Sequence, residues 1–555
     1  MRTYKTEKRF YKWSSGLNLL CLKAWFVFAI PMILVGCNTW QSEYISNQTL
    51  NTGLNQIDTM TLADHSMQPP ITVEQATQQI IKEANEPNQS VRIVELTLGQ
   101  VRAAALANNL DLNIELVNPS IAQQSLEEEK AIFDSTIFGS TNYQRSEAVG
   151  IGDISRSQSS ELGIEKPLPT GGEIQVDMPF SDDYSSGGLA QAAASVSYIQ
   201  SLLRGAGTRV NTQYIRIAAH QWNITSARTK LVAINLLANA DIAYWRLYAA
   251  RKELEVRREQ YKLAQDQLSN AEKKVAAGSS PKIEIVRAKA GLAGRLESVI
   301  NAETAVQRLQ RELLRIINIK DLPLETPVNI VTKTESNPLG LELNEQQLVE
   351  QALTNRMEMI ELEQLLTIDD LNIELAHNNL LPDLTLSYTY SASTQDSGLG
   401  DTFGELRSNS FDSHSVGISA AIPLGNRAAE ARLHRAKLEK MQDLSSLERY
   451  QQIIRQDVYN AVNNLEGSWR RILAAEQGVT AAFRDYKVEQ SQFQLGLSTS
   501  TNVLYSATGL ADAQLRRIYA FADYEIAQIN LARATGTLLG QEQIQIASMD
   551  INSNQ

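Results

Sequence analysis

A long run without a single glycine or proline, residues 208–277, constrains the fold of this chain more than any other feature. If it is fully helical, it extends about 105 Å at 1.5 Å per residue. A second run, residues 426–495, contains no proline and only two glycines, Gly467 and Gly478. Helices of this length are far longer than those of an ordinary globular domain. The sequence therefore predicts an elongated architecture built on two very long helices.

Both runs carry apolar stripes that small and polar residues interrupt. The apolar positions recur at a loose heptad spacing, which is typical of helices that pack side by side. Asp241 interrupts the first stripe, and Gln451 and Ser468 interrupt the second. The stripe positions are Ile224, Ala227, Leu231, Ile234, Ala238, Trp245 and Tyr248 in the first run, and Leu444, Leu447, Ile454, Val458, Ala461, Leu465 and Ile472 in the second. A plain dimeric coiled coil would explain the stripes, but it would not explain the strands that the sequence places between the helices.

Four segments outside the two long runs alternate apolar and polar residues with a period of two. They are residues 133–143, 172–180, 382–390 and 414–422. Such alternation predicts strands with two different faces. It fits an ordinary soluble sheet, and it equally fits a membrane β-barrel, whose strands alternate over about 10 residues.

The chain also repeats its own pattern, which predicts a tandem duplication. Four segments recur in the same order: 96–109 with 343–356, 133–143 with 382–390, 199–207 with 421–427, and 278–286 with 496–504. The offset between the copies shortens along the chain, so insertions differ while the order of elements is kept. The predicted boundaries are a first repeat at 96–320, a link at 321–342, a second repeat at 343–540 and a polar tail at 541–555.

The N-terminus places Cys37 directly after an apolar run and a small residue. Residues 1–23 carry six basic side chains and one acidic side chain, and residues 24–36 are uncharged. An apolar run this short suits a signal-peptide core, and it falls below the ~20 residues that span a bilayer as a helix. The motif LVGC, which ends at Cys37, resembles the lipobox of bacterial lipoproteins. We expect a signal peptide at 1–36 and acylation of Cys37, the alternative being an uncleaved anchor that ends in a free cysteine.

Removal of this signal peptide changes the net charge from −12 to −17. A strongly acidic chain is a poor candidate for binding a phosphate backbone, so nucleic acid is not an expected partner. Only Cys37 would be left, so no disulfide can form within the mature chain. Residues 37–95 are rich in Asn, Gln, Ser and Thr, and they predict a polar tether.

The sequence offers no catalytic or metal-binding constellation. The five histidines, His65, His220, His377, His414 and His434, are scattered, and none belongs to an HExxH motif. The glycine-rich segments GIGDIS and GLGDTFG lack the spacing of the third glycine and the following helix that dinucleotide binding needs. The chain is therefore not expected to be an enzyme or to hold a cofactor or a metal.

Taken together, these features resemble the TolC-like outer-membrane efflux proteins over residues 96–540. The specific pieces are LTLGQVRAAAL, EKPLPTGG, QSLLRGAG, LLPDLTLSYTY, AIPLGNR and GLSTSTNVL. Ser201 stands where family members often have proline. The resemblance implies an α+β membrane protein in which transmembrane β-barrel strands continue into a long α-helical barrel. It further implies a trimer in which each protomer gives four strands, two from each repeat, to a closed twelve-stranded barrel, with residues 319–342 at an equatorial belt.

The same resemblance implies a gate at the helix tips, residues 278–286 and 496–505. Many relatives place acidic side chains at the positions that match Asn502 and Tyr505, where they form a ring of carboxylates. Here these positions hold an amide and a phenol. A strong acidic ring is therefore not expected, although both residues remain candidates for the constriction.

Some relatives latch the closed state between a carboxylate that matches Glu284 and Arg and Tyr groups of the neighbouring tip. Glu284 is present, but the partner positions are Ser498 and Phe493, which lack the charge and the hydroxyl. We expect the closed state to be held by packing and weak hydrogen bonds. The alternative is that Glu284 is a solvated turn residue of little energetic weight.

The function implied is that of a passive exit channel in the outer membrane of a Gram-negative cell. Asn38 fits this localisation, because an aspartate after the lipidated cysteine would resemble an inner-membrane retention signal. The implied partners are two further copies of the chain, a periplasmic adaptor (membrane fusion) protein, an inner-membrane transporter and outer-membrane lipid. The alternative is a periplasmic coiled-coil scaffold that is anchored only by its lipid and forms no pore.

Overall fold

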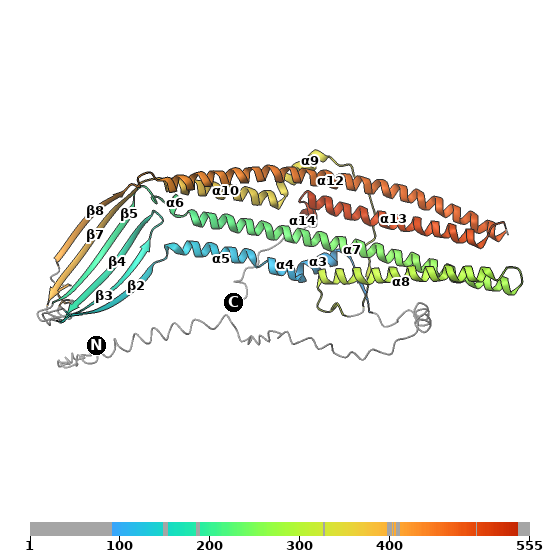
Figure 1. The fold of residues 1–555 in the computed structure, drawn as a ribbon, viewed down its shortest axis with the longest axis horizontal. Helices are drawn as coiled ribbons and strands as arrows, with labels where there is room; N and C mark the ends of the chain where they lie inside the picture. Colours follow the sequence, from blue (N-terminus) through green and yellow to red (C-terminus); the bar gives the residue numbers. More distant parts are fainter. Residues whose placement is uncertain are drawn as a thin grey trace, which may run out of the picture. The chain divides into compact units, whose positions relative to one another are not determined.

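The computed structural model describes residues 92–147, 154–184, 189–325, 328–396, 402, 404–406, 411–495 and 497–541. The predicted signal peptide, Cys37 and all but the last four residues of the predicted tether lie outside these ranges. The described residues all belong to one unit, which combines an antiparallel sheet with long helices (Figure 1). No helix within the described ranges has the length and apolar character that a transmembrane helix needs.

Two long helices dominate the structure, as the sequence predicts. Helix α7 (Gln213–Ala276) has 64 residues and helix α12 (Arg427–Gln494) has 68. Each reverses through a short turn into a helix of 35 residues, α8 (Ile283–Ile317) or α13 (Ser500–Ala534). The first predicted run differs in one detail, because Thr212 separates a short α6 (Thr208–Asn211) from α7.

Shorter helices pack along the long ones, and polar caps fix where several of them begin. They are α3 (Leu98–Asn108), α4 (Leu110–Glu115), α5 (Asn118–Lys130), the 3₁₀ turn η1 (Ala131–Phe133), α9 (Glu345–Asn355), α10 (Met357–Asn378) and α14 (Leu538–Gln541). Thr97 caps α3 in a reciprocal capping box with Gln100, and the side chains of Asn109 and Asn344 cap α4 and α9. Helix α5 packs on α7, and α10 packs on both α7 and α12.

The predicted apolar stripes form much of the core. Ile224 and Ile234 on α7, and Ile454 and Val458 on α12, are buried. Ser468 interrupts its stripe but is also buried, because its hydroxyl donates a hydrogen bond to the carbonyl oxygen of Asn464 at 2.7 Å within the same helix. A polar residue therefore occupies the stripe without leaving its hydroxyl unsatisfied.

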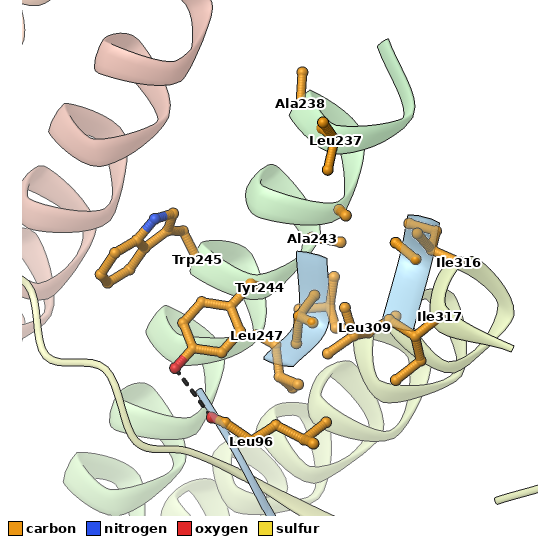
Figure 2. Packing of buried hydrophobic residues seen from close by; sticks show 14 of the residues in the cluster. Leu96, Leu237, Ala238, Ala243, Tyr244, Trp245, Leu247, Leu309, Ile316 and Ile317 are labelled. Atoms are coloured by element: carbon orange, nitrogen blue, oxygen red, sulfur yellow. Dashed lines mark hydrogen bonds between the residues drawn. The ribbon is translucent and has the colours of Figure 1, made fainter. Parts of the chain in front are cut away.

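The largest cluster joins α7 and α8 to the first residues of the described chain. Leu237, Tyr244 and Leu247 of α7 pack against Leu309 and Ile317 of α8 (Figure 2). The Tyr244 hydroxyl donates to the carbonyl oxygen of Leu96 at 3.3 Å and accepts from the backbone N–H of Thr334 at 2.9 Å. One buried phenol thus connects both chain segments that cross the middle of the helices.

Those two segments form a small parallel sheet, which the sequence did not predict. Strand β1 (Arg92–Leu96) pairs with β6 (Val328–Thr332), and Ile330 is fully buried. The last four residues of the predicted tether therefore belong to a strand, and part of the predicted link at 321–342 pairs with them. The first strand precedes the first repeat and the second follows it, so no local pattern marks this pairing.

The main sheet has six strands, in the order β2-β3-β4-β5-β7-β8, and every neighbouring pair is antiparallel. The strands are β2 (Thr136–Glu147), β3 (Ile154–Pro167), β4 (Gly172–Asp183), β5 (Ala190–Ser201), β7 (Asp383–Asp396) and β8 (Phe411–Ala421). The prediction of four strands, two from each half of the chain, is wrong. The four predicted segments match β2, β4, β7 and β8, while β3 and β5 are additional, so the first half supplies four strands.

Candidate channel site

The six strands present one apolar face, because their register places large apolar side chains on the same side. A continuous row runs through Ile164, Val176, Val196 and Tyr390 across four neighbouring strands. We call this side the apolar face; its exposed members include Ile137, Leu162, Ile164, Ile174, Val176, Met178, Val196, Tyr388, Val416 and Ile418. Ile137, Val416 and Ile418 are each more than 70% exposed. Such a large exposed apolar area is typical of a surface that meets lipid or a partner.

The opposite side, here called the polar face, is lined mainly by hydroxyl, amide and carboxylate groups. It includes Ser140, Asn142, Ser159, Glu161, Glu173, Asp177, Ser181, Ser195, Ser197, Thr389, Ser391, Ser415 and Ser419. Ser195 donates to the carboxylate of Asp177 at 2.7 Å, and the hydroxyls of Ser197 and Thr389 lie 3.1 Å apart. The sheet thus separates a lipid-compatible side from a water-compatible side, as strands that line an aqueous channel do.

The sheet is fixed to the helices through the turn between β3 and β4. Thr170 accepts a hydrogen bond from the backbone N–H of Gly207 at 2.9 Å, and Gly171 accepts one from Ser201 at 3.3 Å. Gly171 has a φ of +82°, and a Cβ there would overlap the carbonyl oxygen of Gly205. The turn of the β3–β4 hairpin therefore packs against the backbone that leads from β5 into α6.

The helix tips lie at the end of the helices away from the sheet (Figure 1). Gly278, with a φ of +72°, allows the turn from α7 into α8, and Thr499 caps α13 by accepting from the backbone N–H of Asn502 at 3.3 Å. Glu284 lies in the first turn of α8, where it pairs with Arg287 at 2.8 Å in the same helix. Within one chain, Glu284 therefore has a local partner.

The second tip brings Ser498 and Asn502 together around a third residue. Ser498 donates to the carboxylate of Glu489 at 2.7 Å, and the Asn502 amide donates to the Ser498 hydroxyl at 3.3 Å. Tyr505, in contrast, is 82% exposed. The sequence did not single out Glu489, because it contacts Ser498 only across the α12–α13 turn.

Phe493 has a different partner on the other helix pair. The Lys274 ammonium group lies 4.2 Å from the centroid of the Phe493 ring, within the range of a cation–π interaction. Lys274 belongs to α7 and Phe493 to α12, so this contact connects the two tips of one chain. Sequence reasoning also missed Lys274, since its partner lies in the other half of the chain.

Polar contacts between α7 and α13 continue away from the tips. Gln260 donates to the carbonyl oxygen of Ala507 at 3.4 Å, and Tyr519 donates to the carboxylate of Glu253. Burial, reinforced by the hydrogen bond and charge of Glu253, raises the pKa of Tyr519 well above its usual range. The two helix pairs of the chain are therefore held together along their length as well as at the tips.

Known proteins with similar sequences include outer membrane efflux proteins. The family model described as "Outer membrane efflux protein" matches residues 348–537. The outer membrane protein TolC of Vibrio cholerae serotype O1 is 25% identical over 320 residues, which cover 56% of this chain and 68% of that protein. TolC of Salmonella enteritidis is 25% identical over 178 residues, which cover 32% of this chain and 36% of that protein.

Solved structures share the fold over most of the chain. The Campylobacter jejuni CmeC outer membrane channel has a TM-score of 0.62 and 14% identity, and the match covers 79% of this chain and 85% of that one. The Neisseria gonorrhoeae MtrE outer membrane channel, in its open state, has a TM-score of 0.57 and 18% identity, covering 82% and 94%. CusC has a TM-score of 0.61 and 17% identity, covering 81% and 94%.

Long paired helices joined to a two-faced antiparallel sheet define a TolC-like outer membrane channel fold. Over residues 348–537 the chain matches the outer membrane efflux protein family, and it is similar to TolC over 320 residues. It is accordingly an outer membrane transport protein that reaches into the periplasm, and not an enzyme.

Proposed function

We propose that this chain forms the exit channel of a tripartite efflux or secretion system. In this proposal a homotrimer passively conducts cargo that an inner-membrane transporter and a periplasmic adaptor protein deliver. The observation that carries the proposal is the separation of an apolar face from a polar face across all six strands. Open sheet edges cannot lie in hydrocarbon, because their backbone groups would be unsatisfied, so the sheet must close with other copies.

The helices continue the path that the sheet begins. Strand β5 leads through α6 into α7, and strand β8 leads into α12, so each long helix starts at one end of the sheet and ends at a tip. Both halves of the chain, 96–320 and 343–540, contain short helices, then strands, then a long helix and its return, which supports a tandem duplication. Each chain supplies four helices, α7, α8, α12 and α13, so three copies would surround one water-filled tunnel with twelve helices.

The gate of this tunnel is proposed to lie at the tips, with Glu284, Phe493, Ser498, Asn502 and Tyr505 as constriction candidates. Closure would depend on packing and weak hydrogen bonds, since Glu284 already pairs with Arg287 in its own helix. The cation–π contact of Lys274 with Phe493 would hold the two tips of one protomer together. A transition between closed and open states then requires only weak contacts to separate.

The proposal includes a lipid anchor at Cys37, which lies outside the described residues. An acyl chain on Cys37 would assist targeting or assembly in the outer membrane. Lipid anchors do not approach the effectively irreversible insertion of a membrane-spanning structure, so a closed barrel would remain the main attachment.

Single-channel conductance of the purified, detergent-extracted protein in a planar bilayer tests the proposal. Discrete, salt-dependent conductance steps are the expected result. A folded trimer that never inserts or conducts would contradict the channel and would favour the lipid-anchored coiled-coil scaffold. Folding is verified separately by helical circular dichroism, so an inactive preparation is not mistaken for a pore-less protein.

A further inference from the structure

The two edge strands of the main sheet lack the features that protect a free edge. Residues 136–144 of β2 and residues 415–421 of β8 contain neither a charged side chain nor a proline. Natural proteins usually protect exposed edges with charges, prolines or bulges, because a bare edge pairs with other chains. Strands of 12 and 11 residues are also long for free edges. Both edges are therefore suited to pairing with another strand.

The strand count shows which partner fits. Five successive antiparallel pairings make β2 and β8 run in opposite directions, with the apolar residues of both on the same side. Strand β8 of one copy can therefore pair antiparallel with β2 of the next, and the apolar face stays continuous. A head-to-tail contact of this kind closes into a ring when it is repeated.

The β3–β4 hairpin belongs to this wall. Its strands have 14 and 12 residues, which match the lengths of the flanking strands β2 and β5. Leu162 and Ile164 of β3 pair with Met178 and Val176 of β4, and all four lie on the apolar face. Because the hairpin occupies the middle of the sheet, β2 and β5 meet only through it.

We propose that the β3–β4 hairpin is part of the membrane wall, so that a trimer closed by pairing β8 of each copy with β2 of the next forms an eighteen-stranded barrel. The count of eighteen strands rests on the trimer of the proposed function. The pairing of β8 with β2 does not depend on the number of copies. Barrel diameter grows roughly linearly with strand number, so this barrel is about one and a half times as wide as a twelve-stranded one. The hairpin thereby sets the size of the outer exit, and it brings Glu161, Glu173 and Asp177 onto its inner face.

Cysteine cross-linking in isolated outer membranes tests the edge pairing. Each of three polar-face positions on β2 is combined with each of three on β8, because the register between copies is not fixed by one chain. The positions are Thr136, Ser140 and Asn142 on β2, and Ser413, Ser415 and Ser419 on β8, all changed to cysteine. Disulfides require Cα atoms within about 7 Å, so only combinations in register should react.

Two controls are built from the same sheet. The Ser197→Cys/Thr389→Cys variant joins facing residues of β5 and β7, so it should form a disulfide within one chain. The Ser195→Cys/Ser415→Cys variant places cysteines on β5 and β8, which are separated by β7, and it should form none. Single-cysteine variants report any cross-linking that involves Cys37.

The expected result is a reducible ladder of dimers and trimers from at least one β2–β8 combination. If all nine combinations stay monomeric while the β5–β7 control reacts and the native mass is that of a trimer, the edge pairing is overturned but the trimer stands. If a ladder ends at another number of copies, the trimer and the count of eighteen are overturned while the edge pairing stands.

A labelling experiment tests whether the hairpin lies in the wall. Single cysteines replace Ser159 and Ser181 on its polar face, and Leu162 and Val176 on its apolar face. A water-soluble maleimide should label the first two in intact membranes and spare the other two until detergent is added. Equal labelling of both faces in a folded trimer would remove the hairpin from the wall and overturn the eighteen-stranded barrel.

Discussion

Arg102 and Asp241 form a two-pronged ion pair that fastens α3 to the first long helix. The Arg102 Nε atom lies 2.9 Å from Asp241 Oδ1, and its Nη2 atom lies 3.0 Å from Oδ2. The Asp241 side chain is fully buried, whereas that of Arg102 is 22% exposed. Burial raises the pKa of Asp241, although the hydrogen bonds and charge of Arg102 act in the opposite direction. Asp241 interrupts the apolar stripe of α7, and among the described residues Arg102 alone donates hydrogen bonds to both of its carboxylate oxygens.

Arg102→Met should destabilise the protein strongly, because it leaves a buried carboxylate without a partner. Loss of one member of a buried pair costs about 3–5 kcal/mol. Replacing both residues, as in Arg102→Met/Asp241→Leu, should recover much of this loss, because no charge is then left buried. Denaturant-induced loss of helicity in detergent measures both effects. If the double variant is as unstable as Arg102→Met alone, the pair does not explain the cost.

Asp369 on α10 is expected to make stability depend on pH. The side chain is buried and faces Asp443 and Glu439 of α12, while Asp370 lies beside it and pairs with Lys440. Burial, followed by repulsion from Asp443, raises the pKa of Asp369 from 3.8 to about 6. A raised folded-state pKa contributes stability that is complete below pH 3.8 and is lost as the pH rises through about 6.

Asp369→Asn should remove this dependence, since asparagine stays neutral. The wild type should lose about 2 °C of melting temperature relative to Asp369→Asn between pH 5 and pH 7. Thermal melts of both proteins at closely spaced pH values provide the measurement. Glu363→Gln serves as the matched control, because it neutralises an exposed carboxylate on the same helix that is not among the groups acting on Asp369. Parallel melting curves for the wild type and Asp369→Asn across this range would refute the assignment.

Comparison of these sites with the sequence shows which features are locally encoded. Helices α7 and α12 follow from runs that lack helix breakers, and β7 follows from strict alternation between Asp383 and Tyr390. The strands β3 and β5 were missed because the first is polar over most of its length and the second is rich in alanine. Pairing with neighbouring strands, and not local preference, defines both.

The partners at the sites were missed for the same physical reason. Arg102 lies 139 residues before Asp241, so the sequence showed an interrupted stripe without showing what satisfies it. At the tips, the candidates Ser498 and Asn502 do lie together. Glu489 contacts Ser498, and Lys274 contacts Phe493, only once the helices have reversed and packed. Local spacing identifies helix ends; it does not identify contacts between helices.

Phe493→Leu should make the closed state easier to leave. The change keeps an apolar side chain but removes the ring that the Lys274 ammonium group contacts. An exposed cation–π contact contributes about 0.5–1 kcal/mol, which corresponds to roughly a two- to five-fold increase in open probability. Phe483→Leu is the matched control, because Phe483 also lies near a lysine, Lys487, but within α12 alone. Equal effects of the two variants in planar bilayers would rule out a role for the contact between tips.

Cys37→Ser should abolish acylation without releasing the protein from the outer membrane. The closed barrel is expected to hold the protein even when the lipid is absent, since insertion of a membrane-spanning structure is far stronger than a lipid anchor. Metabolic labelling with a radioactive fatty acid, followed by membrane fractionation, measures both properties. Recovery of the variant as a soluble periplasmic protein would contradict a barrel-inserted channel.

Asn502→Asp should make the channel more selective for cations, because it places a carboxylate beside Ser498 and Glu489 at the second tip. Reversal potentials in a salt gradient across a planar bilayer report this selectivity.

Glu284→Gln is the comparison variant: Glu284 pairs with Arg287 in its own helix, and a partly exposed pair of this kind contributes about 0.3–0.5 kcal/mol. We expect less than a two-fold change in leak current from Glu284→Gln. A selectivity change confined to Asn502→Asp would place the constriction at Asn502, whereas a large leak in Glu284→Gln would reveal an ionic latch between protomers. If neither variant alters conduction through a channel that still conducts, the constriction lies away from both tips.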